Sequence, residues 1–189
     1  MRQELGHVTK ETEYFHQLDV ELIENMRRRA DQEEQRRRMT ETCQIDDPDI
    51  LEALERLGYS PTTVSLLCLV PLVQVAWADC VVSHAERNRI FAIAGLHGVK
   101  ESTPAYHQLE AWLDWPPPPE FFQGTLRAIH AALDLLPPNE RNARRDVLID
   151  HCTDVAAAAG WHLGKIGAAE RKLIEELHRQ LEPHQQAAA

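Results

Sequence analysis

The chain has 189 residues, a formal net charge of −10 and only 6% aromatic residues. That length suits one domain with its own core plus a flanking segment, and the abundance of Ala, Leu, Glu and Arg favours helix almost throughout. The negative charge repels phosphate backbones and argues against a nucleic-acid partner, and the polar N-terminus argues against a secretory signal peptide. We therefore expect an all-α protein that stays in the cytoplasm.

Residues 1–45 form the flanking segment, which we expect to be a polar helical arm. A helical pattern runs from about residue 11 to residue 42, with a narrow apolar stripe at spacings of three and four, made of Phe15, Leu18, Leu22 and Met26. Residues 27–38, RRRADQEEQRRR, hold no large apolar side chain, so they cannot pack deeply. This part of the helix either stands in solvent or bridges to a partner.

Prolines and capping residues mark the next helices. Asp47 and Ser60 each precede a proline, so each is expected to cap a helix that has proline at its first position. Gly58 fits the C-terminal cap between them. The apolar run LLCLVPLVQVAWA extends for only about 13 residues and contains Pro71, whereas roughly 20 are needed to span a bilayer. We expect a buried core helix that Pro71 kinks or restarts.

The remaining helices are separated by proline-rich or glycine-containing links, of which Trp115–Pro119, WPPPP, is expected to be extended. Of the four tryptophans, Trp115 is the one most expected to be exposed, while the others complete the core. Residues 46–182 then make one helical domain, and 183–189 make a disordered tail. With the arm, the expected total is seven to eight helices, the later ones at about 85–96, 104–113, 120–136, 139–159 and 168–181.

An internal repeat appears when the sequence is shifted against itself by 84 residues. ADCVVSHAERNRI then aligns with HLGKIGAAERKLI, so that Glu86 matches Glu170 and Cys80 matches Gly164. Each copy has an apolar helix, a turn, a small capping residue and a glutamate three positions later. In the first copy Ser83 and Glu86 fit a capping box, in which hydroxyl and carboxylate satisfy backbone amides at the helix start. The chain is thus expected to contain two related helical hairpins.

The segment PLVQVAWADCVVSHAERNRI resembles the signature of the tellurite-resistance TerB-like family. That signature reads as an apolar helix, Ala-Asp-Gly, a hydrophobic residue, a short linker and Glu, and VAAAAGWHLGKIGAAERKLI is similar to the family's second hairpin. The resemblance covers roughly residues 60–181. It implies an all-helical, pseudo-two-fold domain without established catalysis, associated with divalent metal binding and bacterial stress-response assemblies.

By this resemblance Asp79 and Glu86 are the acidic pair of the first hairpin, and Glu170 is the acid of the second. The chain departs from the family pattern at three places. Cys80 stands where the family has Gly, so a positive φ at this position would strain the backbone. Leu163 stands where a second Asp is expected, and Trp161 replaces a second Gly.

Three chemical interpretations of the first turn stay open. A hard ion such as Ca²⁺ needs six to eight oxygens, of which Asp79 and Glu86 supply a few. A softer, zinc-like set would use Cys80 and His84 with one of these acids. Alternatively, Glu86 only caps its helix.

An enzyme is not expected from this sequence. The ten histidines are scattered without an HExxH motif, and there is no glycine-rich phosphate loop or GxSxG elbow. The four cysteines lack CxxC spacing and are expected to be free thiols, with Cys68 and Cys152 as small core residues.

We therefore expect a non-enzymatic, TerB-like protein-interaction module in a stress-response or assembly role, with a divalent metal ion at the Asp79–Glu86 turn as an option. The alternative is a structural or oligomerisation protein without metal, in which the N-terminal helix mediates self-association or docks a partner.

Overall fold

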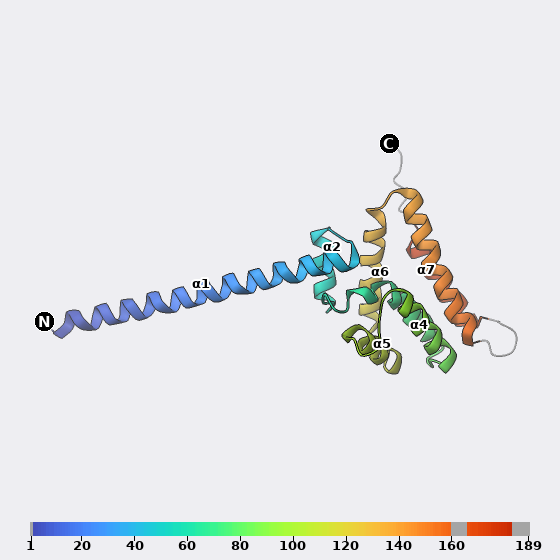
Figure 1. Ribbon diagram of the computed structural model, residues 1–189, viewed down its shortest axis with the longest axis horizontal. Helices are drawn as coiled ribbons and strands as arrows, with labels where there is room; N and C mark the ends of the chain where they lie inside the picture. The colour runs from blue at the N-terminus through green and yellow to red at the C-terminus, as the bar shows by residue number, and fades with distance from the viewer. Residues whose placement is uncertain (1, 160–165, 183–189) are drawn as a thin grey trace. The chain divides into compact units, whose positions relative to one another are not determined.

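A computed structural model describes the backbone of residues 2–159 and 166–182 and, from residue 16 onward, their side chains. These residues form eight α-helices and one 3₁₀ helix, without a β-strand (Figure 1). The expected all-α class and helix number are confirmed. The elements in chain order are α1 (Arg2–Cys43), α2 (Pro48–Arg56), η1 (Val64–Leu69), α3 (Val70–Ala76), α4 (His84–Leu96), α5 (Pro104–Asp114), α6 (Pro119–Asp134), α7 (Pro138–Ala159) and α8 (Ala168–Gln180).

The chain divides into two compact units, residues 1–38 and residues 39–189. The first unit is the greater part of α1, which starts earlier than the apolar pattern alone predicts. Its arginine-rich stretch, residues 27–38, is exposed or half-buried, as expected for a segment without large apolar side chains. Glu34 accepts hydrogen bonds from Arg37 and Arg38, and these lower its pKa to about 2. Such pairs between neighbouring turns support an exposed helix.

The caps read from the sequence are present around α2 but not at Ser60. Asp47 Oδ1 accepts hydrogen bonds from the amides of Asp49 and Ile50, and Gly58 follows the helix with a φ of 87°.

The prediction that Ser60 caps an α-helix is wrong. Its hydroxyl bonds the hydroxyls of two neighbouring threonines, and only a turn and the 3₁₀ helix η1 follow. The α-helix begins again at Val70, next to Pro71, so the proline marks a restart.

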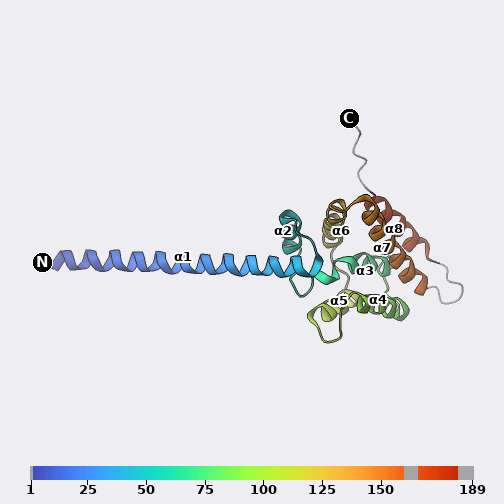
Figure 2. The same cartoon turned by 45° about the horizontal axis from the view of Figure 1, so that its top comes forward.

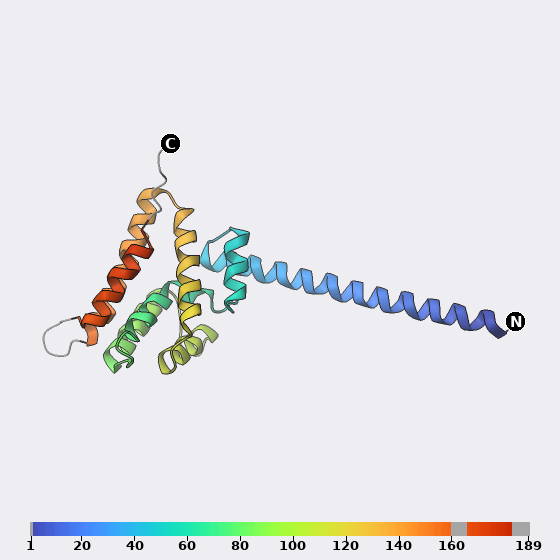
Figure 3. The same cartoon turned by 180° about the vertical axis from the view of Figure 1, so that it is seen from behind.

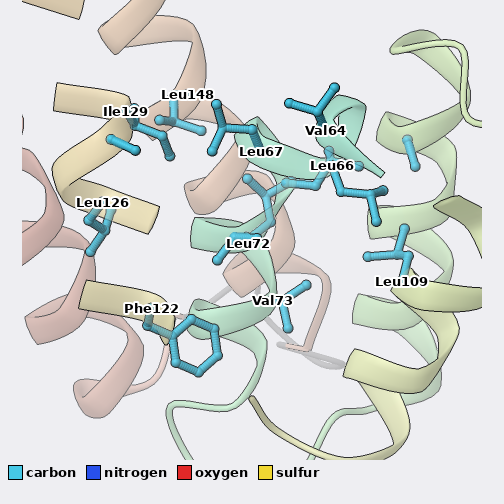
Figure 4. Close-up of a cluster of buried hydrophobic side chains, with 14 of the residues drawn as sticks. Val64, Leu66, Leu67, Leu72, Val73, Leu109, Phe122, Leu126, Ile129 and Leu148 are labelled. Carbon is cyan, nitrogen blue, oxygen red and sulfur yellow. The ribbon is translucent and has the colours of Figure 1, made fainter. Parts of the chain in front are cut away.

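Helix α3 forms the centre of the second unit (Figure 2). It contacts η1, α4, α6, α7 and α8, and all of its residues but one are buried. Because α3 is surrounded by other helices, the apolar segment that forms it has apolar side chains on every side instead of along one stripe. Figure 4 labels part of the surrounding core, in which Leu72 and Val73 of α3 lie between Phe122 on one side and Leu109 on the other. The expectation of a buried core helix is confirmed.

The proline-rich link between α5 and α6 is extended at Trp115 and includes the buried Pro117. Trp115 is 80% exposed, as expected, whereas Trp112 packs against the core and its carbonyl accepts a hydrogen bond from the Trp77 indole. Tyr59 and Phe121 stack beside the link, with ring centroids 5.6 Å apart. The prolines therefore join α5 to α6 at a fixed place on the core. Helix α6 itself begins at Pro119.

Two further expectations concern disulfide bonds between the cysteines and helices that could span a membrane. All four cysteines are free; Cys152 is fully buried and Cys68 half-buried. None of the described helices combines the length and the apolarity that crossing a bilayer requires.

Candidate functional site

The first candidate site is the turn between α3 and α4, which the sequence singled out. Helix α3 contacts α8, and α4 contacts α7, while α7 and α8 also lie against each other (Figure 3). The turn preceding α4 and the residues preceding α8 thus belong to one four-helix group. Trp161, Leu163 and Gly164, on which part of the comparison between the two hairpins rests, lie outside the described residues, as does the segment 183–189.

Glu86 turns back onto the start of its own helix. The amide of Ser83 donates to Glu86 Oε2 at 2.8 Å, and the amide of Glu86 donates to Ser83 Oγ at 3.2 Å. This is the complete capping box that the sequence predicts. The side chain of Glu86 is only 2% exposed. Its carboxylate therefore already has a structural task in the absence of any ion.

Glu170 makes the corresponding contact at the start of α8. Its Oε2 accepts a hydrogen bond from the amide of Gly167 at 2.6 Å, and the residue is 5% exposed. Glycine has no side chain, so only this half of the box can form. A Cβ placed on Gly167 would lie 2.9 Å from Glu170 Oε2, the end of a flexible side chain. A side chain at this position therefore requires only a small shift of the glutamate, and Ser83 at the start of α4 shows that a residue with a Cβ is compatible with the same contact.

Asp79 is also used locally, since its Oδ1 accepts a hydrogen bond from the amide of Val81 at 3.1 Å. Cys80 and His84, the softer ligands considered, are both exposed. Among the described residues, no three His, Cys, Asp or Glu side chains are grouped so that they could hold a metal ion. The geometry assigns the acids of this turn to backbone amides.

The charges of the other two acids nevertheless act on Glu86. Burial raises the pKa of Glu86, hydrogen bonds from Ser83 lower it, and the charges of Glu170 and Asp79 raise it further. The structure thus brings the two matching glutamates of the repeat into one electrostatic environment. The sequence alignment alone does not predict this proximity.

Cys80 adopts a φ of 69°, in the left-handed region that favours glycine. Left-handed geometry costs a non-glycine residue about 1–2 kcal/mol, whereas glycine loses about 0.4–1 kcal/mol more conformational freedom on folding. Cys80→Gly is therefore expected to raise the free energy of unfolding by about 0.5–1 kcal/mol, measured by urea denaturation. Cys80→Ala is the control, because it removes the thiol but keeps the strain. Equal stability of the two variants would contradict the argument.

A second candidate site is a cleft that the sequence did not reveal. It has a volume of about 560 Å³ and lies in the second unit, among η1, α6, α7 and the residues that lead into α2. Four of its apolar residues, Val64, Leu67, Ile129 and Leu148, appear along the upper side of Figure 4. This volume falls within the range usual for small-molecule sites.

Polar groups meet at one part of this cleft. The Cys68 thiol lies 3.7 Å from His97 Nδ1, and the rings of His97 and His151 are 5.9 Å apart, edge to face. Burial raises the pKa of Cys68 to about 11, so its thiol is protonated at neutral pH and is not a thiolate nucleophile. Burial, together with His151, lowers the pKa of His97. These three residues are far apart in the sequence, so no sequence motif predicts that their side chains lie together.

Comparisons of the chain with protein-family models, with curated proteins and with solved structures find no match.

Proposed function

We propose that the chain is a non-enzymatic, TerB-like helical module that acts by binding proteins, and that α1 carries the contact surface. The observation on which this depends is the apolar surface of α1. Five large hydrophobic residues of this helix are 41–63% exposed: Leu18, Val20, Leu22, Ile23 and Met26. Contiguous apolar side chains on an otherwise charged helix are typical of an association surface.

A helix of this kind gains much of its stability from a partner. Isolated helices are marginal in water, and most helical stability in proteins comes from packing of an apolar face. The side chains of residues 16–33 are exposed, apart from the half-buried Asn25. Burying each large apolar side chain contributes about 1.5–3 kcal/mol. Covering the stripe therefore offers a substantial driving force for association.

A second copy of the chain is the partner that we propose. Leu18, Leu22 and Met26 follow one another at intervals of four residues, so they lie along one helix face. Two such faces can pack side by side, as in a short coiled coil, with the polar residues left in solvent.

The test is sedimentation velocity on the full chain over a concentration series. Replacing Leu18, Leu22 and Met26 together by Gln preserves helix propensity and removes the apolar face. We expect self-association to weaken by about 100-fold or more, because packing of three large side chains is lost. The matched control replaces three exposed residues of the second unit, Val81, Leu96 and Leu135, by Gln. A wild-type chain that stays monomeric, or equal weakening by both triples, would remove self-association from the proposal.

The TerB-like part of the proposal is supported by the two hairpins. Helices α4 and α8 both begin with a buried glutamate that accepts from its own N-cap amide, and these glutamates are 84 positions apart. The crossed contacts of α3 with α8 and of α4 with α7 are those expected of a pseudo-two-fold pair. The positive φ of Cys80, at the position where the family has Gly, agrees with the same interpretation.

A divalent ion such as Ca²⁺ at this turn is the second candidate. In its favour, Asp79 and Glu170 both raise the pKa of Glu86, so an ion that offset this repulsion would stabilise the turn. Isothermal titration calorimetry with Ca²⁺, Mg²⁺, Mn²⁺ and Zn²⁺ tests it. Ion binding at this turn predicts a binding heat and a higher melting temperature for the wild type, and neither for Asp79→Ala. If none of the four ions gives a binding heat, the proposal that this turn binds a divalent ion is wrong.

A further inference from the structure

The cleft in the second unit has an unusual lining for so acidic a protein. The chain carries a net charge of −10, yet among the residues that the structure describes no Asp or Glu lines the cleft, whereas Arg144, His97 and His151 do. We propose that this cleft binds a small amphiphile with an apolar tail and a carboxylate head, such as a medium-chain fatty acid. This proposal is independent of the association through α1.

The apolar part of the cleft suits the tail. Its walls come from η1, α6 and α7, and they are formed mainly by aliphatic side chains: Val64, Leu67, Ile129, Leu133, Val147 and Leu148. Val147 is 52% exposed, so the apolar surface continues to the mouth. Each methylene group transferred from water to such a surface strengthens binding by roughly four-fold.

One face of α7 sets the polarity along the cleft. Arg144, Val147, Leu148 and His151 are three or four residues apart, which places them along a single helix face. Arg144 and His151 are thus separated by two turns, or roughly 10 Å along the helix. Arg144 is exposed at one end of this face. The apolar side chains lie between the guanidinium and the imidazole.

The charge state of the lining assigns the head to Arg144. Burial raises the pKa of Cys68 to about 11 and keeps its thiol protonated at neutral pH, while partial burial and the neighbouring His151 lower the pKa of His97, which is exposed to solvent. The guanidinium, by contrast, stays charged and binds carboxylates through paired hydrogen bonds. The tail therefore lies along the aliphatic side chains of the lining, beside Val147 and Leu148, and the head stays at the exposed Arg144.

Decanoate, below the concentration at which it forms micelles, is the probe for isothermal titration calorimetry on the full chain. We expect Arg144→Gln to weaken decanoate binding by at least 10-fold, because the charge-assisted hydrogen bonds to the head are lost. Arg127→Gln, which removes an exposed arginine of α6 outside the cleft, is the matched control and should bind as the wild type does. Neutral decanol should bind the wild type and Arg144→Gln equally.

Two variants block the cleft itself. Ala132→Phe fills the tail site and should abolish binding of both decanoate and decanol. Val147→Asp places a negative charge on an exposed position at the mouth of the cleft. It should weaken decanoate binding by at least 10-fold without disturbing the fold. Circular dichroism and melting temperature check that each variant is folded. Decanoate binding that is unchanged in Val147→Asp and Arg144→Gln, or an absence of binding to the wild type, would overturn the proposal.

Discussion

Replacing Leu72 by Ala is expected to lower the free energy of unfolding by about 2–5 kcal/mol. Leu72 is fully buried in α3, the helix that contacts η1, α4, α6, α7 and α8. Removing its side chain forfeits the transfer free energy of three carbon atoms, and it leaves a cavity that surrounding helices cannot all close at once. Urea denaturation followed by circular dichroism measures the loss.

The control for this experiment is the same substitution at Leu96, which is 81% exposed at the end of α4. Leu96→Ala changes the same chemical groups but removes little buried surface, so it should stay within about 0.5 kcal/mol of the wild type. A loss at Leu72 no larger than that at Leu96 would mean that α3 is not the centre of the core.

Replacing Glu86 by Ala is expected to cost about 1–3 kcal/mol, because it leaves the amide of Ser83 without its acceptor and removes buried side-chain contacts. Glu86→Gln keeps an oxygen in the same place and should cost clearly less. The two variants separate a capping role from a purely ionic one, since capping needs an acceptor but no charge. Denaturation in the presence of a chelator measures both without any contribution from an ion.

The pH dependence of Glu86→Gln gives an independent check. Burial and the charges of Glu170 and Asp79 raise the folded-state pKa of Glu86 above its ordinary value of 4.5. Between the ordinary pKa and the raised pKa of the folded state, Glu86 binds more protons in the folded state than in the unfolded state. The contribution of Glu86 to the stability of the wild type therefore falls as the pH rises through this range. Glutamine does not titrate. The stability of Glu86→Gln relative to the wild type should therefore grow with rising pH and level off above the folded-state pKa; a flat or falling difference would contradict the raised pKa.

The sequence by itself determined the local structure of this protein. Prolines and capping residues act within a few positions of their own backbone, so Asp47 and Gly58 marked helix ends that the structure contains. The capping box of Ser83 and Glu86 was readable for the same reason. Ser60 was the exception, because its hydroxyl found neighbouring threonine hydroxyls instead of the amides of a following helix.

Only the tertiary structure decided which distant residues meet. Cys68, His97 and His151 line one cleft although they are spread over three elements, and no spacing rule relates them. The proximity of Glu86 and Glu170 likewise depends on how α3 and α4 pack against α7 and α8. Such contacts follow from the burial of apolar surface, which is favourable for any pair of apolar faces and carries little directional information in the sequence.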